Sequence, residues 1–373
     1  MKKIGILTFH YSHNYGGVLQ AFALQNTLKK YHKDYQIDII DFVPKSYKNQ
    51  SIFGILKLRK NLFKNSIKDL NPKTVIIRLL RHIRYYKKLS IEFNKFRDNY
   101  MSFSKHANED NFLVVISDYD VIVVGSDQIW NPSQRLKPYY FLNFIDYYGS
   151  RISYAADSTF SNVSNDEKEY LKPALTRFKY ISVRNTHSQS FVNKITSQNP
   201  IIVCDPTFLQ DFSCISVPKK LNKGYILCYI IGKEIKNGHK AAISRIKQYK
   251  GNKPVYLIRL LESGIIDNSF ADRVFYNISP LEWVYLIENA DFVYTDSYHG
   301  VLFSIKYNKD FLAYYTEVER ASRFVELSTN YGLQDVIVQS LDDYNNSEIN
   351  YIDIKSKLNK EIESSLKFIK DMI

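Results

Sequence analysis

His299 lies in a short polar stretch between two apolar runs. The segment DFVYTDSYHGVLFSI, residues 291–305, predicts a buried strand followed directly by a helix. With Asp296 or Ser297 as N-cap, His299 and Gly300 fall in the first helical turn, where unpaired backbone N–H groups attract anions. A histidine at this position can donate to a phosphate or carboxylate or transfer a proton. It can equally cap the helix and pack beneath a loop.

Polar residues also follow five other predicted strands, which end at residues 9, 125, 156, 184 and 204. Asp127 comes just after the apolar run 120–125, and Arg184 ends the run 180–184. The carboxyl ends of parallel strands share one edge of a sheet, and ligands of open α/β sheets bind at that edge. We therefore expect a ligand cleft lined by these strand ends, although Asp127 could also serve only to cap its turn.

The loop HYSHNYGG, residues 10–17, separates the first predicted strand from a helix. Its last four residues, suited to binding a phosphate or the hydroxyls of a ligand, are Asn14, Tyr15, Gly16 and Gly17. The loop has neither GxGxxG nor a P-loop lysine, so it does not predict NAD or ATP binding. His10 and His13 have no carboxylate partner at a fixed spacing, and we predict no metal site. Ser126 is not in a GxSxG hydrolase motif.

The elements that must position these residues form two successive α/β series. Strand, helix and strand alternate from 4–9 to 36–43, which predicts parallel pairing. A second series starts at 201–204. A chain of 373 residues is long enough for two domains. We predict an N-terminal domain over residues 1–180, a C-terminal domain over 181–345, and a closing helix over 346–373, with the cleft between the domains.

The net charge of +13 is concentrated in one segment. Residues 46–105 hold 15 Lys and Arg against three acids, a balance of +12. This pattern argues against general nucleic-acid binding and for one basic face on an amphipathic helical insert, which we place at residues 46–110. That face could be simply solvated, or it could contact an anionic membrane surface through residues 46–105. No apolar run is long enough to span a bilayer, and the three cysteines form no CxxC pair, which suits a reducing cytoplasm.

Six motifs occur in order along the chain: GILTFHYSHNYGGVLQAFALQ (5–25), VIVVGSDQIWNP (121–132), ISYAAD (152–157), ISVRN (181–185), CDPTFL (204–209), and ADFVYTDSYHGVLFSI (290–305) with SRF (322–324). In these motifs the chain resembles the polysaccharide pyruvyl transferase family, from the N-terminus to about residue 340, and the basic insert is its least family-like part. The resemblance implies a GT-B-like fold, in which two Rossmann-like domains face each other across a cleft. It also implies transfer of a pyruvyl group from phosphoenolpyruvate to two sugar hydroxyls, giving a pyruvate ketal on a bacterial surface or capsule polysaccharide.

The resemblance implies roles on the donor side. His299 matches the motif histidine, so we expect it to contact phosphoenolpyruvate and act as a general acid, with Ser297 and Gly300 beside the donor. Arg184 matches a family arginine that is usually followed by Glu, where this chain has Asn185. Some members carry Arg where this chain has Ser297, and Arg320 or Arg323 could supply that missing cation.

The acceptor side is expected in the first domain. Asp127 matches GSDQIWN and could activate a sugar hydroxyl, Trp130 could stack on a sugar ring, and residues 14–17 could hold the acceptor. We expect phosphoenolpyruvate as co-substrate with no other cofactor, a sugar or lipid-linked oligosaccharide as acceptor, and a cytoplasmic protein at the inner face of the membrane. Two alternatives stay open: a glycosyltransferase with a nucleotide-sugar donor, and a non-catalytic sugar-binding relative.

Overall fold

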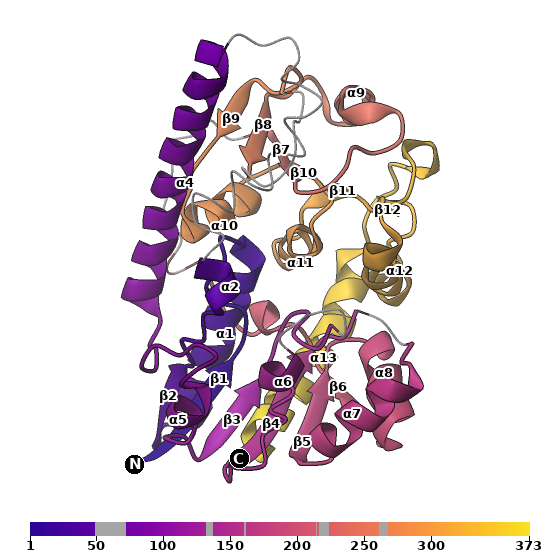
Figure 1. Ribbon diagram of the computed structural model, residues 1–373. Helices are drawn as coiled ribbons and strands as arrows, with labels where there is room; N and C mark the ends of the chain where they lie inside the picture. The colour runs from indigo at the N-terminus through magenta and orange to yellow at the C-terminus, as the bar shows by residue number, and fades with distance from the viewer. Residues whose placement is uncertain (49–71, 132–136, 160–161, 214, 216–223, 261–267) are drawn as a thin grey trace.

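The chain folds into two six-stranded sheets, and every strand pair within each sheet is parallel (Figure 1). The computed structural model describes residues 1–373 except 49–71, 132–136, 160–161, 214, 216–223 and 261–267. The first sheet has the order β2 (Tyr35–Ile39), β1 (Lys2–Leu7), β3 (Val121–Val124), β4 (Ser150–Ala156), β5 (Phe178–Val183) and β6 (Ile201–Ile202). The second has the order β12 (Ile337–Val338), β11 (Asp310–Tyr314), β10 (Phe292–Thr295), β7 (Ile226–Ile230), β8 (Val255–Arg259) and β9 (Arg273–Phe275). The prediction of two Rossmann-like domains is confirmed.

Helices cover these sheets. In the first half of the chain they are α1 (Tyr15–Tyr31), α2 (Lys45–Lys48), α4 (Pro72–Tyr100), α5 (Phe112–Ile116), α6 (Lys137–Tyr140), α7 (Asn165–Leu175) and α8 (Thr186–Thr196). The second half contains η1 (Pro206–Phe208), α9 (Gly238–Lys250), α10 (Pro280–Glu288), α11 (Tyr298–Lys306), α12 (Val318–Tyr331), η2 (Leu341–Asp343) and α13 (Tyr351–Asp371). Because helices lie on both faces, central strands such as β3 and β10 are buried at every residue, which explains their continuous apolar runs.

The boundary between the domains lies later than predicted. Ser182 and Val183 of β5 pair with Ile201 and Ile202 of β6, so both strands belong to the first sheet. The predicted boundary at residue 180 therefore falls inside β5, and the second sheet starts only with β7. An apolar run marks a strand but does not reveal which sheet that strand joins, and this is why 201–204 was assigned to the second series.

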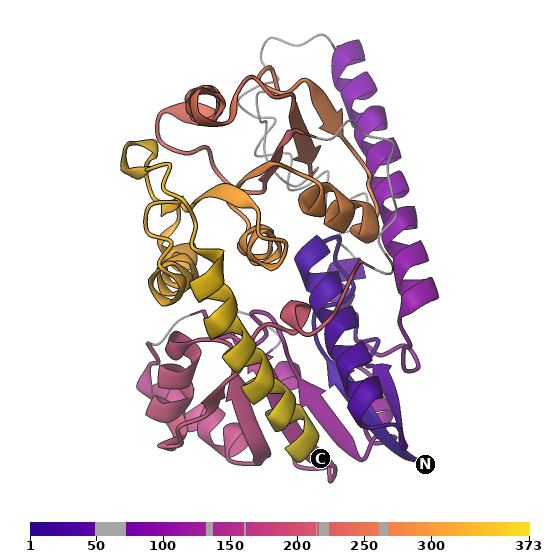
Figure 2. The ribbon, with the colours of Figure 1, turned by 180° about the vertical axis from the view of Figure 1, so that it is seen from behind.

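The closing helix α13 returns to the first domain (Figure 2). Ser365 of α13 accepts a hydrogen bond from the Cys204 backbone N–H at 2.9 Å. The Nε2 atom of His32, at the end of α1, donates to the Ile369 carbonyl at 2.7 Å. The C-terminal segment thus fastens the second domain to the first.

Helix α4 also contacts both domains along the edge of the molecule (Figure 1). On one side Phe93 packs against Tyr15 of α1, with ring centroids 5.0 Å apart. Toward its N-terminal end Tyr85 stacks on Tyr276, just after β9, at 4.9 Å and an interplanar angle of 4°. This helix supplies most of the described part of the predicted basic insert, and residues 49–71 of that insert lie outside the described residues.

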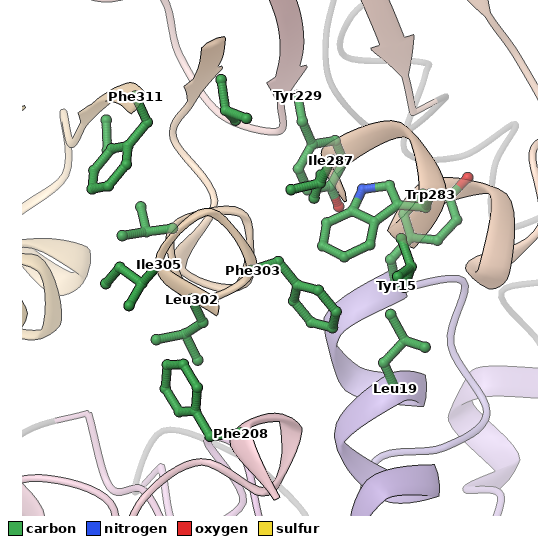
Figure 3. Close-up of a cluster of buried hydrophobic side chains, with 14 of the residues drawn as sticks. Tyr15, Leu19, Phe208, Tyr229, Trp283, Ile287, Leu302, Phe303, Ile305 and Phe311 are labelled. Carbon is green, nitrogen blue, oxygen red and sulfur yellow. The ribbon is translucent and has the colours of Figure 1, made fainter. Parts of the chain in front are cut away.

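A hydrophobic cluster joins the domains at their centre (Figure 3). Tyr15 of α1 stacks on Trp283 of α10, with centroids 5.6 Å apart and rings 8° from parallel. Trp283 in turn meets Phe303 of α11 edge to face at 4.9 Å. The first turn of α1 and the helix that carries His299 are therefore held together by shared core packing.

Candidate active site

Arg184 forms the centre of a buried ionic cluster at the carboxyl end of β5. Its side chain is only 1% exposed. One guanidinium nitrogen donates to Asp205 at 3.0 Å and the other to Asp157 at 2.5 Å, while Asp127 lies 3.6 Å away. These aspartates follow β3, β4 and β6, so parallel pairing brings together carboxylates that are distant in sequence.

The carboxylates of Asp157 and Asp205 both stay ionised because cations surround them. Burial alone would raise the pKa of Asp157, but Arg184 and Arg323 lower it to about 2. Burial also opposes ionisation of Asp205, and there the His299 ring and Arg184 bring the pKa well below its usual range. Asp127 differs from these two, since its side chain is 13% exposed and theirs are at most 1%. It is therefore the carboxylate of the three that a ligand can reach most easily.

His299 lies in the first turn of α11, as its sequence context predicts. Ser297 is the N-cap, and its hydroxyl accepts from the Gly300 N–H at 3.2 Å. The imidazole is nearly buried, with Nε2 at 3.6 Å from the Asp205 carboxylate. In the described part of the chain this Nε2 has no hydrogen-bond partner. His299 thus combines a helix N-terminus, a charged carboxylate neighbour and an unused ring nitrogen.

Gly16 lies directly against His299. A Cβ atom built on Gly16 would come within 2.1 Å of both Cγ and Nδ1 of the imidazole. At the domain interface, the backbone in the first turn of α1 therefore contacts the imidazole ring in the first turn of α11. Only glycine allows this approach, since any side chain would displace the ring.

The other residues of the predicted acceptor loop have separate roles. Asn14 is the exposed N-cap of α1, and its side chain accepts from the Gly17 N–H at 3.2 Å. Tyr15 is buried, and its hydroxyl donates to the Ile278 carbonyl at 3.0 Å. Tyr15 therefore belongs to the core and presents no surface to an acceptor.

Arg323 of α12 brings a second cation to the cluster. Its guanidinium lies 5.2 Å from the centre of the Tyr298 ring, and that of Arg184 lies 4.9 Å from the same ring. With its amide oriented to suit these donors, Gln128 accepts from both terminal nitrogens of Arg323, at 3.1 and 3.2 Å. Arg323 therefore lies where it could replace the arginine expected at the position of Ser297. The side chain of Arg320, the other candidate, lies outside the described residues.

A family model described as polysaccharide pyruvyl transferase covers residues 14–317, which include every residue of the ionic cluster except Arg323. The chain belongs to this family. Among curated proteins none matches the sequence.

Several solved structures are similar over nearly the whole chain. UDP-GlcNAc 2-epimerase from Methanocaldococcus jannaschii has 13% identity and a TM-score of 0.49, covering 98% of this chain and 93% of that one. The enzyme of the same name from Neisseria meningitidis, bound to UDP-GlcNAc, has 10% identity, a TM-score of 0.46, and coverage of 100% and 95%. UGT89C1 from Arabidopsis thaliana, complexed with quercetin, has 10% identity, a TM-score of 0.45, and coverage of 99% and 92%.

The prediction that Trp130 stacks on a sugar ring is wrong. The side chain is fully buried, and its indole N–H donates to the Tyr140 carbonyl at 3.1 Å. It also stacks on Phe141 with centroids 5.5 Å apart. Because no face of the indole is exposed, it has no surface on which a sugar could stack.

Sequence reasoning missed Asp157 and Asp205 as site residues. Asp157 ends the motif ISYAAD and Asp205 is the second residue of CDPTFL, and each directly follows a predicted strand, so the signal was present, but neither was given a role. Asn185, which stands where the family usually has Glu, is the N-cap of α8 and accepts from the Ser188 N–H at 2.8 Å.

A small cavity adjoins the cluster. It has a volume of about 120 Å³ and is lined by residues that include Arg184, Asp205, Tyr298, Arg323 and Glu326.

The described side chains include no group of three or more His, Cys, Asp and Glu residues arranged to hold a metal ion. Within the described ranges, no helix has the length and apolar character needed to span a bilayer.

Proposed function

We propose that this chain transfers a pyruvyl group from phosphoenolpyruvate to two hydroxyls of a sugar in a bacterial surface polysaccharide or its lipid-linked precursor. The observation that carries the proposal is His299, held at the N-terminus of α11 and 3.6 Å from the Asp205 carboxylate. Phosphoenolpyruvate is a compact polyanion, and the positive N-terminal end of a helix suits its phosphate or carboxylate.

The reaction requires an acid and a base. The methylene carbon of phosphoenolpyruvate gains a proton, the adjacent carbon accepts a sugar oxygen, and the hydroxyl proton leaves to a base. Phosphate then departs as the second hydroxyl adds, which closes the ketal and releases a second proton. His299 is the proposed acid, because an imidazole can transfer a proton and its Nε2 lies 3.6 Å from the Asp205 carboxylate at the start of α11. Asp127, the most exposed carboxylate of the cluster, is the proposed base.

The two arginines of the site, Arg323 and Arg184, are proposed to have different roles. Arg323, together with Ser297 and Gly300 at the start of α11, is proposed to contact the donor. Arg184 was expected to do the same, but its terminal nitrogens are engaged by carboxylates and its side chain is buried, whereas Arg323 is partly exposed and is bound by the neutral amide of Gln128. We therefore assign Arg184 the role of positioning the three aspartates, including Asp205 beside His299.

We also propose a peripheral contact between helix α4 and the membrane surface. Arg84, Lys87, Lys88 and Lys95 of α4 are exposed and lie within the basic segment 46–105. Their charge would attract the anionic leaflet on which lipid-linked sugars are carried. Pelleting with phosphatidylglycerol vesicles at physiological salt tests this contact, and protein that stays in the supernatant would refute it.

Isotope incorporation tests the transfer itself. The protein is incubated with phosphoenolpyruvate and a panel of oligosaccharides in D₂O, and phosphate release is followed by ³¹P NMR. We expect phosphate release that depends on an oligosaccharide, with one deuterium in the methyl group of the ketal by mass spectrometry. His299→Gln should abolish both signals. Phosphate release without a sugar product, or equal turnover by His299→Gln, would contradict the proposal.

A further inference from the structure

A large cavity in the first domain lies apart from the ionic cluster. It has a volume of about 750 Å³ and is bordered by the loop after β1, by α2 and by α4. This volume is within the range of roughly 300–1,000 Å³ that is usual for ligand pockets. The lining residues that matter for its chemistry are His10, Tyr11, Asp41, Tyr47, Tyr86 and Arg97.

Aromatic rings approach the cavity from three elements. Tyr11 in the loop and Tyr47 in α2 meet at a centroid distance of 4.6 Å and an angle of 61°. Tyr86 enters from α4 and packs against His13, with centroids 4.9 Å apart. Each of the three tyrosines is partly exposed, so each retains ring surface for a ligand. Tyrosine rings of this kind present both an apolar face and a hydroxyl.

The carboxylate of Asp41 also lines the cavity. His10 contacts one oxygen of Asp41 at 3.0 Å, and His106 contacts the other at 2.9 Å. The Asp41 side chain remains 29% exposed, so it can still accept hydrogen bonds. Arg97 is also held in place, since one terminal nitrogen donates to the His10 carbonyl at 3.1 Å.

The charges along the wall balance. Asp41 and Asp98 oppose Lys87 and Arg97, so the described lining residues include equal numbers of Asp or Glu and of Lys or Arg. A phosphate or nucleotide would meet two carboxylates as well as two cations here, so it gains no net attraction, whereas an uncharged polyhydroxylated ring can stack on tyrosine and donate hydroxyls to Asp41. Ring faces combined with fixed polar groups favour a neutral sugar.

The cavity is connected to His299 through one short loop. His10 and Tyr11 line the cavity, and Gly16 in the same segment touches the imidazole. Six residues of chain reach at most about 20 Å, so a glycan in the cavity could extend to His299. We propose that this cavity binds an uncharged sugar of the acceptor glycan, an inference that rests on the proposed function. Because α4 belongs to the least family-like segment, the cavity would let this chain select its own acceptor.

Saturation-transfer NMR on the full chain tests the cavity. The probes are methyl glycosides and disaccharides of neutral hexoses and N-acetylhexosamines, with and without phosphoenolpyruvate. We expect at least one probe to receive saturation, Tyr86→Ala to reduce it at least fivefold, and Tyr86→Phe to retain it because the ring remains. Tyr170→Ala, an exposed tyrosine of α7, is the matched control and should change nothing.

Two results would overturn this inference. One is the absence of saturation for every probe in both conditions, and the other is equal saturation in wild type and in a folded Tyr86→Ala. Binding of phosphoenolpyruvate is measured separately by thermal shift. Retained donor binding with no sugar binding would remove only the cavity proposal, whereas sugar binding that depends on Tyr86 without donor binding would remove only the proposed transfer.

Discussion

At the scale of single residues, His299 depends on two neighbours from other parts of the chain. Asp205 places a permanently charged carboxylate 3.6 Å from its Nε2 atom, and Gly16 leaves the space that its ring occupies. The histidine and its N-cap Ser297 could be predicted from local spacing, because capping involves residues three positions apart. The contact with Gly16 could not, since nothing local connects residues 16 and 299.

Gly16→Ala should damage the site through this contact. The new methyl group would lie 2.1 Å from the imidazole, so the ring or the helix must shift. Overpacking of this kind costs about 1–3 kcal/mol, and we expect that loss in the free energy of unfolding by urea titration, together with loss of donor binding.

Gly17→Ala is the matched control for this substitution. Its Cβ would meet the Asn14 side chain at 3.5 Å, an ordinary contact. We expect stability within 0.5 kcal/mol of wild type or slightly above it, since alanine favours helix by up to about 1 kcal/mol. Equal effects at the two glycines would contradict the close packing of Gly16 on His299.

Arg184→Met should be strongly destabilising. It leaves the buried carboxylates of Asp157 and Asp205 without their main counter-charge. Removing one partner of a buried ionic pair typically costs about 3–5 kcal/mol, and urea titration would measure it. Arg177→Met, which removes an exposed arginine bonded only weakly to Asn143, is the control and should cost less than about 0.5 kcal/mol. A mild effect at Arg184 would mean that the cluster does not organise the site.

At the scale of elements, periodicity predicted some segments correctly and others only in part. The strand and helix predicted within 291–305 are present as β10 and α11, because a short apolar run flanked by polar residues is distinctive. The run at 201–204 was recognised as a strand but placed in the wrong sheet, because strand pairing is a long-range property. Trp130 was predicted at the acceptor site for a similar reason: a tryptophan suits a core and a sugar site equally well, and only the fold distinguishes them.

Helix α4 leads to a prediction about coupling between the domains. Tyr85 of α4 and Tyr276 of the second domain stack with nearly parallel rings. A double-mutant cycle of Tyr85→Ala and Tyr276→Ala should give an interaction energy of about 0.5–1.5 kcal/mol in thermal or urea unfolding. Additive single effects would show that α4 does not join the two domains through this pair.

At the scale of the whole molecule, the two domains and the interface site follow from the order of elements. Alternating strands and helices predicted two α/β units, and the rule that ligands bind at carboxyl strand ends predicted a site between them. The return of α13 to the first domain could not be predicted, because its amphipathic pattern reveals a buried face but not the surface that covers it.

Acid should destabilise the whole chain through His13. Burial, and then the nearby Arg97, lower the pKa of this histidine from 6.5 to about 4. Between these values the unfolded chain binds more protons than the folded one, so stability falls as pH falls through this window. From pH 7 to pH 5 the contribution of His13 is a loss of roughly 2 kcal/mol.

His13→Gln should therefore reduce the dependence of stability on pH. Urea titrations of both proteins at pH 7 and pH 5 measure the difference, and the change between the two pH values should be smaller in the variant. The lowered pKa values of Asp157 and Asp205 act only below about pH 4 and do not enter this window. The same change in both proteins would contradict burial of a neutral His13.

The central claim is that phosphoenolpyruvate binds beside His299, and a thermal shift experiment tests it most directly. Wild type and His299→Gln are heated alone and with phosphoenolpyruvate, pyruvate, UDP or GDP. A ligand at a hundred times its Kd adds about 2.7 kcal/mol, enough to raise Tm by several degrees. We predict that phosphoenolpyruvate raises the Tm of the wild type and leaves that of His299→Gln unchanged. No shift with phosphoenolpyruvate, an equal shift in both proteins, or a shift with UDP or GDP alone would contradict the account.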